Sequence, residues 1–234
     1  MVTIGIVGAM EEEVDFLIHQ MTDVTEEEIA GLTFYHGDLM EKDTVVVQTG
    51  IGKVNMAACT QLLITAFHVD MLINIGVAGS LRDDVHVGDI VVSEKAVQYD
   101  FSVEGLPSYQ EGLIPGFGEE LGFRADVELV SLACQAARKV LPEYQCYTGT
   151  IVTGDQFIAK AETKKHLAEE FDGLCTEMEG GAMAQVAVMN HVPFVIIRSI
   201  SDEADENALK KFETHEELAI VNTIKVLLGM YYKI

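Results

Sequence analysis

The chain has 234 residues, 49% of them hydrophobic, and its 38 acidic and 15 basic side chains give a formal net charge of −23. A chain of this length can bury a sizeable core, and we expect a single domain over residues 1–234. The negative charge repels phosphate backbones and argues against nucleic acid as a partner. No apolar run approaches the ~18 residues that span a membrane, and the amino terminus lacks the basic region of a signal peptide. Four scattered cysteines are typical of reduced thiols, so we expect a cytoplasmic protein.

The first segment has the pattern of a strand followed by an amphipathic helix. Residues 3–9 are apolar and predict a buried strand, and residues 10–21 carry apolar side chains at helical spacing. Three glutamates, Glu11, Glu12 and Glu13, lie in the first turn of that helix. The helical projection points Glu12 away from the apolar face and places Glu11 and Glu13 on its two flanks, so spacing leaves the choice between those two open. Acidic residues are also common in the first turn of any helix, where they interact with its dipole.

The middle of the chain alternates between strand and helix patterns. Residues 29–40 and 44–49 predict a hairpin or meander around Gly37-Asp38, and the glycine-rich residues 104–123 predict a long loop. Residues 76–80 are small and follow a short strand, which would let a ligand approach the backbone. Further strands are expected at 71–75, 88–97 and 147–152. Further helices are expected from about 53 to 67, at 126–140, at 160–170 and at the carboxyl end. A polar, lid-like segment at 203–213 precedes the last of these helices.

Known cofactor motifs are missing from the sequence. The segment with Gly50, Gly52 and Lys53 resembles a phosphate loop, but Val47 and Val54 stand where the Walker A motif requires Gly and Ser or Thr. The amino-terminal strand lacks G-x-G-x-x-G, and the seven histidines form no H-E-x-x-H. We therefore expect no metal and no cofactor.

The stretch from residue 174 to 205 carries the most informative pattern. Glu177 and Glu179 lie in a turn that opens into a helix of small residues, and an apolar strand follows that carries Arg198 and ends at Asp202. Ligands of open α/β sheets bind outside the carboxyl ends of the strands, so Glu179 and Asp202 are expected at the same rim. Each carboxylate alone also has an ordinary structural explanation, as a helix-dipole partner or as a turn former.

Glycine-rich and acidic segments recur at the ends of the expected strands: IGIVGAMEEEV (4–14), TGIGKVNMA (49–57), NIGVAGSL (74–81), VGDIVVS (87–93), TGDQFI (153–158), EMEGGAMA (177–184) and RSISDEAD (198–205). The set resembles the 5′-methylthioadenosine/S-adenosylhomocysteine nucleosidases of the nucleoside phosphorylase family, over nearly the whole chain. The resemblance implies a three-layer α/β/α fold with a central mixed, twisted sheet, and a homodimer. It also implies hydrolysis of the N-glycosidic bond of methylthioadenosine and S-adenosylhomocysteine to adenine and the thio-substituted ribose, in methionine salvage.

Residue roles follow from the same resemblance. It implies that Glu13 deprotonates the attacking water, that Asp202 protonates N7 of adenine, and that Glu179 holds the ribose hydroxyls. Ile51 and Pro115 match positions that the partner subunit contributes. The other implied substrate-binding residues are Met10, Ala78, Gly79, Val103, Phe157, Ile158, Met178, Arg198, Ser201 and Phe212. One departure is Val77, where many relatives carry a polar Ser.

The chemistry of N-ribosyl hydrolysis agrees with these roles. Its transition state carries positive charge on the ribose, which carboxylates stabilise, and adenine leaves readily only when an acid protonates it. Asp202 must therefore be protonated, and we expect the apolar strand behind it and neighbouring glutamates to raise its pKa. Arg198 would oppose this if it faced Asp202, so we expect it to pair with another carboxylate.

Two alternatives share the predicted pocket. A nucleoside phosphorylase transfers ribose to phosphate, which calls for arginine forks. The chain has four arginines, none in its first 81 residues, and three glutamates stand where that branch would hold phosphate. A non-catalytic adenosine sensor would need only the pocket. The presence of Glu13, Glu179 and Asp202 together therefore argues against a sensor.

Overall fold

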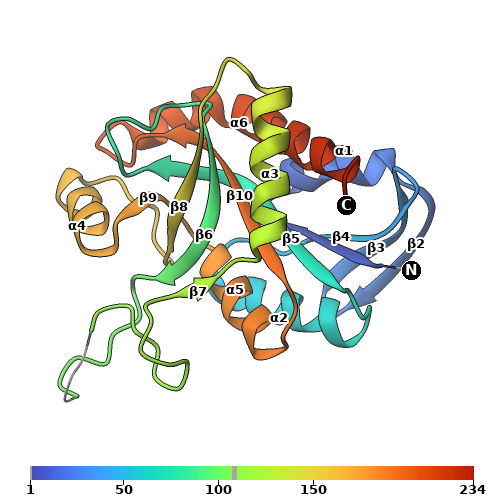
Figure 1. Ribbon diagram of the computed structural model, residues 1–234, viewed down its shortest axis with the longest axis horizontal. Coiled ribbons are helices and arrows are strands. Elements are labelled where there is room, and N and C mark those ends of the chain that lie inside the picture. Colours follow the sequence, from blue (N-terminus) through green and yellow to red (C-terminus); the bar gives the residue numbers. More distant parts are fainter. Residues whose placement is uncertain (1, 107–109) are drawn as a thin grey trace.

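The computed structural model describes residues 2–106 and 110–234 (Figure 1). The described strands are β1 (Ile4–Gly8), β2 (Thr22–Ile29), β3 (Leu32–Leu39), β4 (Lys42–Gln48), β5 (Met71–Ser80), β6 (Ile90–Gln98), β7 (Phe123–Arg124), β8 (Cys146–Thr153), β9 (Gly173–Glu177) and β10 (Phe194–Asp202). The described helices are α1 (Glu11–Gln20), α2 (Lys53–Thr65), α3 (Val127–Val140), α4 (Ala161–Phe171), α5 (Gly180–Met189) and α6 (Ala208–Tyr231). None of the helices in these residues is long and apolar enough to span a membrane.

All of these strands belong to one mixed sheet in the order β10-β6-β8-β9-β5-β1-β4-β3-β2, with β7 beside β6. A further parallel pairing of β10 with β5 closes β5, β10, β6, β8 and β9 into a ring. Strands β1, β4, β3 and β2 continue the sheet outside this ring. The α/β class with a mixed sheet is confirmed, and the closed ring is a feature that strand patterns did not predict.

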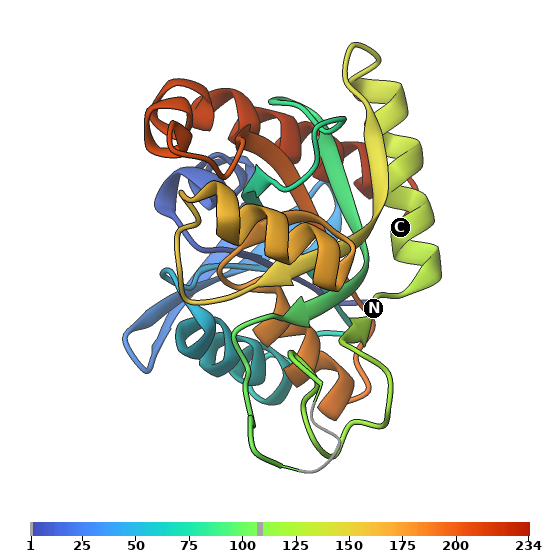
Figure 2. The ribbon, with the colours of Figure 1, turned by 90° about the vertical axis from the view of Figure 1, so that its left-hand side faces the viewer.

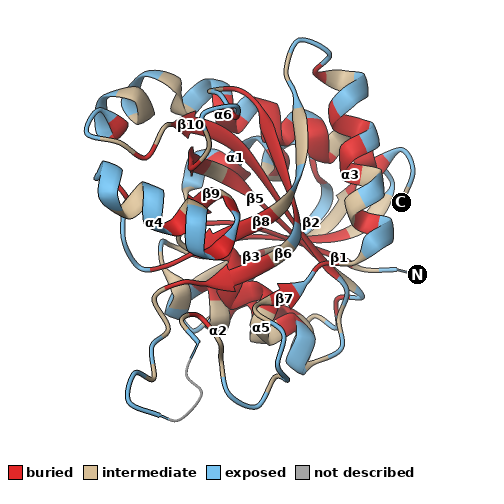
Figure 3. Cartoon of the chain, turned by 60° about the vertical axis from the view of Figure 1, so that its left-hand side comes forward, coloured by how far each residue is buried: buried red, intermediate tan, exposed pale blue. Residues whose placement is uncertain are grey.

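Helices cover both faces of the sheet (Figures 1 and 2). One apolar cluster packs α1, α3 and α6 against the sheet through residues such as Leu17, Leu129 and Leu227. A second cluster packs α2 and α5 through residues such as Met56 and Met183. The sheet itself is buried almost throughout its central strands, as Figure 3 shows. The sheet thus forms a rigid base for the loops at its strand ends.

Strands β2, β3 and β4 form a meander, as one of the two predicted arrangements required, but the predicted turn at Gly37-Asp38 is wrong. Both residues lie inside β3, and the turns fall at Ala30-Gly31 and Met40-Glu41. All four of those turn residues have positive φ, which two-residue hairpin turns of the mirror-image type require. The sequence pattern also missed β2, because its side chains are acidic and mostly exposed and show no apolar alternation.

Candidate active site

A cavity of about 380 Å³ opens where several strands of the sheet end. Its lining residues come from the loops after β1, β4, β8 and β9, from the ends of β5, β9 and β10, and from α1 and α6. The lining residues are Ala9, Met10, Glu13, Ile51, Val77, Ala78, Gly79, Gln156, Phe157, Ile158, Thr176, Glu177, Met178, Glu179, Ser201, Asp202, Leu209 and Phe212. A mostly apolar cavity with a few convergent polar groups at strand ends is typical of a small-molecule site.

Glu13 points from the first turn of α1 into this cavity and is only 3% exposed. One carboxylate oxygen accepts hydrogen bonds from the backbone N–H groups of Ala9 (2.6 Å) and Met10 (3.0 Å), and the other accepts from Val77 N–H (3.3 Å). Glu11 and Glu12 are exposed, so the choice that helical spacing left open is resolved in favour of Glu13. Burial raises the pKa of Glu13, while Arg198 and the three backbone donors act in the opposite direction.

Asp202 ends β10 on another wall of the cavity and is 2% exposed. The Ser201 hydroxyl donates to one carboxylate oxygen, and the Ala204 N–H donates to the other, both at 2.9 Å. Burial raises the pKa of Asp202, as expected from the sequence. The nearby carboxylate that adds to this shift is Asp205, not a glutamate, and Lys211 opposes it.

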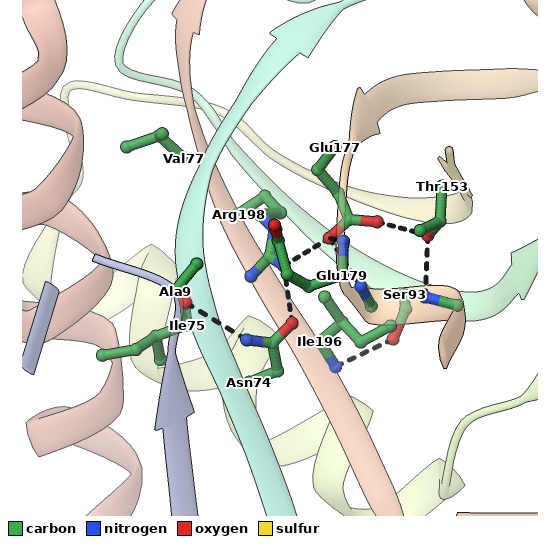
Figure 4. A network of polar contacts seen from close by, with 12 residues as sticks. Ala9, Asn74, Ile75, Val77, Ser93, Thr153, Glu177, Glu179, Ile196 and Arg198 are labelled. Carbon is green, nitrogen blue, oxygen red and sulfur yellow. Dashed lines mark hydrogen bonds and ion pairs between the residues drawn. The ribbon is translucent and has the colours of Figure 1, made fainter. Parts of the chain in front are cut away.

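Arg198 and Glu177 form an ion pair beneath the cavity, and Figure 4 shows this network. Arg198 Nη2 lies 2.5 Å from Glu177 Oε2 and 2.5 Å from Asn74 Oδ1. Glu177 also accepts hydrogen bonds from the Thr153 hydroxyl and from the backbone N–H groups of Glu179 (3.1 Å) and Gly180 (2.7 Å). The expectation that Arg198 pairs with a carboxylate other than Asp202 is confirmed.

Glu179 is also buried, but its carboxylate has a different environment. Its Oε1 accepts the Gly52 N–H at 2.8 Å, and no cation lies within 4 Å of it among the described residues. Burial and the neighbouring Glu177 raise the pKa of Glu179 to about 7, although Arg198 acts against them. Because Arg198 is paired with Glu177, the cavity presents the carboxyl groups of Glu13, Glu179 and Asp202 without an ion-paired cation in the described part of the chain.

The remaining walls are apolar. Phe157 and Phe212 meet edge to face, with ring centroids 6.1 Å apart. The side chains of Phe157 and Leu209 are largely exposed at the cavity mouth. Such walls suit a flat aromatic ligand with an apolar substituent.

The sequence profile of the Phosphorylase superfamily matches residues 3–230. The chain belongs to this superfamily.

Relatives and solved structures within the superfamily agree on a narrower group. The 5′-methylthioadenosine/S-adenosylhomocysteine nucleosidase of Exiguobacterium sp. is 40% identical over 97% of this chain and 96% of its own. The nucleosidase of the same name from Neisseria meningitidis, solved with methylthio-immucillin-A, has a TM-score of 0.94 at 33% identity, covering 100% of both chains. The futalosine hydrolase of Helicobacter pylori strain 26695 has a TM-score of 0.93 at 32% identity, covering 100% of this chain and 98% of its own. The family resemblance found in the sequence is confirmed.

Most of the site residues expected from this superfamily line the cavity, and a few do not. Arg198 lies below the floor, and Val103, in the long segment between β6 and β7, is not among the residues that line the cavity. Pro115 lies in the same segment, and its contribution from a partner subunit stays a prediction. Ile51 had been expected to reach the site from a partner subunit. Instead, it lines the cavity of its own chain. The reason is that its loop follows β4, whose end lies at the cavity.

Five residues of the site were not assigned a role from the sequence. Ala9, Gln156, Thr176 and Leu209 line the cavity, and Glu177 lines it and pairs with Arg198. For Glu177 a signal existed: an arginine in an apolar strand requires a carboxylate, and Glu177 was one of two in the preceding turn. Gln156 and Leu209 have no such signal. Each lies close in sequence to a recognised site residue, Phe157 or Phe212, but is not itself part of a motif that indicates a role.

Proposed function

We propose that this protein hydrolyses the N-glycosidic bond of 5′-methylthioadenosine and S-adenosylhomocysteine, releasing adenine and the 5-thio-substituted ribose. The observation that carries the proposal is that Glu13, Glu179 and Asp202 line one apolar cavity whose nearby arginine is paired with Glu177. Relatives and similar structures bearing the name of this nucleosidase support the choice of substrate.

In the proposed reaction, a water oxygen attacks C1′ of the ribose while the bond from C1′ to N9 of adenine breaks. Glu13 takes the proton of the attacking water, for which it must be ionised. The electron pair of the broken bond stays on adenine. Asp202 neutralises the negative charge of the leaving adenine by giving a proton to N7. The raised pKa of Asp202 favours the protonated acid that this step needs.

Positive charge develops on the ribose ring as the bond breaks. Carboxylates in a water-excluded site stabilise such charge more strongly than they would in water. Glu179 is proposed to accept hydrogen bonds from the ribose hydroxyls, with Met178 packed against the sugar. Arg198, below the floor, is proposed to pair with Glu177 and so to hold the turn between β9 and α5 in place.

The apolar walls are assigned to the two ends of the substrate. Phe157 and Ile158 would hold the adenine, together with backbone groups near Ala78, Gly79 and Ser201. Met10, Ile51 and Phe212 would surround the 5′-alkylthio group. Val77 adds a further apolar side chain beside Glu13, where many relatives were expected to carry a hydroxyl.

Water is proposed as the acceptor, rather than phosphate. No lysine or arginine lines the cavity within the described residues. A dianionic phosphate beside three carboxyl groups would be repelled, and the Arg198 guanidinium below the cavity does not offset this because it is paired with Glu177.

The direct test is to incubate the purified protein with methylthioadenosine, with and without phosphate, and to identify the products. Adenine and free methylthioribose at equal rates in both reactions support the proposal. A ribose 1-phosphate product would identify a phosphorylase, and unchanged, bound substrate would identify a sensor. Parallel reactions with S-adenosylhomocysteine, 5′-deoxyadenosine and aminodeoxyfutalosine rank the substrates by kcat/KM.

We also propose that the protein is a cytoplasmic homodimer that acts in methionine salvage. Ile51 at the cavity is 54% exposed, and Val54 in the first turn of the following helix α2 is also exposed, so apolar side chains are open to solvent beside the cavity. Apolar patches of this kind often mark interfaces. Pro115 is proposed to reach this region from the partner, and the four free cysteines are compatible with a reducing compartment.

A further inference from the structure

Three charged side chains outside the cavity connect three separate loops of the molecule. Lys53 is the first residue of α2, Asp100 follows β6, and Asp155 follows β8. Lys53 Nζ lies 2.5 Å from Asp100 Oδ1, and the Asp155 N–H donates to Asp100 Oδ2 at 3.0 Å. The Lys53 N–H donates to Asp155 Oδ1 at 2.8 Å, which completes the set. We call these three residues the loop clamp; none of them lines the cavity.

The loop clamp lies between two walls of the cavity. Ile51 and Gly52 immediately precede Lys53, and the segment 156–158 immediately follows Asp155; Ile51 and all three residues of that segment line the cavity. The Gly52 N–H is also the donor to Glu179. Both walls are therefore fixed to each other by side chains that do not touch the cavity.

The start of α2 explains why this connection is needed. The first N–H groups of a helix have no partner within the helix, and a side chain at the N-cap usually accepts from one of them. The N-cap here is Gly52, which has no side chain to do so and has φ of +103°. Asp155 accepts the Lys53 N–H instead, from a position 102 residues further along the chain.

The charges of the loop clamp strengthen this arrangement. The side chains of Lys53 and Asp100 are each only 19% exposed, so their ion pair is more shielded from water than a surface pair. Both oxygens of Asp100 are used, one by Lys53 and one by the Asp155 N–H. Asp155 is itself exposed, so its position depends on these contacts and not on burial.

We propose that Lys53, Asp100 and Asp155 are positioning residues of the proposed nucleosidase, which hold the Gly52 N–H against Glu179. The inference rests on the proposed function for its kinetic consequence, but its structural part does not. Gly52 provides the one hydrogen bond that the described structure gives the Glu179 carboxylate. Releasing this N–H would leave Glu179 free to turn away from the ribose.

Releasing the Gly52 N–H would also change the ionisation of Glu179. The charged groups that act on it are Glu177, Arg198 and Glu13, and none of them changes when the loop clamp is broken. Because the hydrogen bond favours the ionised carboxylate, its loss raises the pKa of Glu179 further. The acidic limb of the kcat/KM profile should then move to higher pH, which a purely structural weakening would not cause.

The test compares Asp155→Ala with Asp155→Asn, because the amide oxygen of Asn can still accept the Lys53 N–H. For Asp155→Ala we expect KM for methylthioadenosine to rise about tenfold, the loss typical of one hydrogen bond to a charged group, and the acidic limb to move upward. Asp155→Asn should stay near wild type in both respects. Asp83→Ala, a change at an exposed aspartate outside the loop clamp, is the matched control.

A second readout does not depend on activity. Hydrogen–deuterium exchange should be faster in the peptide that covers residues 49–53 in Asp155→Ala than in wild type, Asp155→Asn or Asp83→Ala. If Asp155→Ala does not fold, Lys53→Met, which removes the ion pair and keeps the aliphatic stem, takes its place in both measurements.

The inference is overturned if Asp155→Ala keeps the wild-type KM, pH profile and exchange rate. It is also overturned if Asp155→Asn is as impaired as Asp155→Ala, since the carboxylate charge and not the hydrogen bond would then matter. Wild-type protein that releases no adenine would refute the proposed function instead, and the exchange experiment would still decide whether the loop clamp holds the Gly52 loop.

Discussion

Arg198 and Glu177 are both 2% exposed, and together they form the buried ion pair beneath the cavity. Removing one partner of such a pair leaves an uncompensated buried charge, which costs about 3–5 kcal/mol. We expect Arg198→Met and Glu177→Met each to lower the free energy of unfolding by this amount in urea denaturation. The double variant should lose less than the sum of the two single losses, by a coupling of about 1–3 kcal/mol. Additive losses would mean that the two side chains act independently.

Asp202→Asn should lower kcat for methylthioadenosine by about 10²–10⁴-fold, the usual contribution of a general acid. Asn keeps the size of the side chain and can accept the Ala204 N–H, so binding of adenine, measured by calorimetry, should fall much less. Turnover near the wild-type rate in this variant would refute the role of Asp202 as the acid.

Glu13→Gln should abolish hydrolysis while the fold is retained, because Gln can accept the backbone N–H groups but cannot take a proton from water. Glu12→Gln is the matched control, since Glu12 is the adjacent residue on α1, is exposed and does not line the cavity. Product release should be measured under single-turnover conditions for both. Loss of activity in Glu12→Gln, with Glu13→Gln active, would contradict the assignment.

The raised pKa of Glu179 predicts how stability depends on pH. Its ordinary value of 4.5 applies to the unfolded chain and about 7 to the folded one, so the folded state binds more protons between these limits. The free energy of unfolding should therefore fall as pH rises from about 4.5 to about 7, by roughly 1–3 kcal/mol for this group. Glu179→Gln carries no titratable group there and should lack this part of the dependence.

Glu13 and Asp202 are buried carboxylates with raised pKa values as well, and they contribute in the same direction. They are present in both proteins, so the difference between wild type and Glu179→Gln reports Glu179 together with its electrostatic interaction with Glu13. Urea denaturation at pH 5 and pH 8 gives this difference. An equal change with pH in both proteins would mean that Glu179 titrates normally.

Ile51→Glu should weaken the proposed dimer and raise KM for methylthioadenosine. In a symmetric interface the change introduces two like charges into a protein of net charge −23. Sedimentation velocity over a range of concentrations measures the association. Full activity in wild-type protein that sediments as a monomer at every concentration would contradict the dimer.

The sequence predicted the elements of the site better than the contacts that complete it. Apolar periodicity excluded Glu12 and left Glu11 and Glu13 open, and the family resemblance then pointed to Glu13. The position of Asp202 at a strand end follows from the rule that ligands bind beyond the carboxyl ends of strands. The pairing of Arg198 with a carboxylate followed from the cost of an unpaired buried charge. These inferences depend on side-chain chemistry, which the sequence displays directly.

The contacts that were missed depend on the backbone or on distant pairings. The Gly52 N–H that binds Glu179 has no side chain to mark it, and Asp155 is 102 residues away from the helix that it caps. The closed ring of strands arises from the pairing of β10 with β5, which no local pattern indicates. The turn at Gly37-Asp38 was misplaced because Ala30, Met40 and Glu41 adopt positive φ without being glycine.

The exposed, acidic strand β2 lies at the open end of the sheet. Its outer edge carries unpaired backbone groups that another chain could extend, which is the first step of edge-to-edge aggregation. Glu26, Glu27 and Glu28 place like charges along this edge, so two copies that approached through β2 would repel each other at neutral pH. The glutamate run that hid this strand from the sequence pattern thus acts as a gatekeeper against self-association.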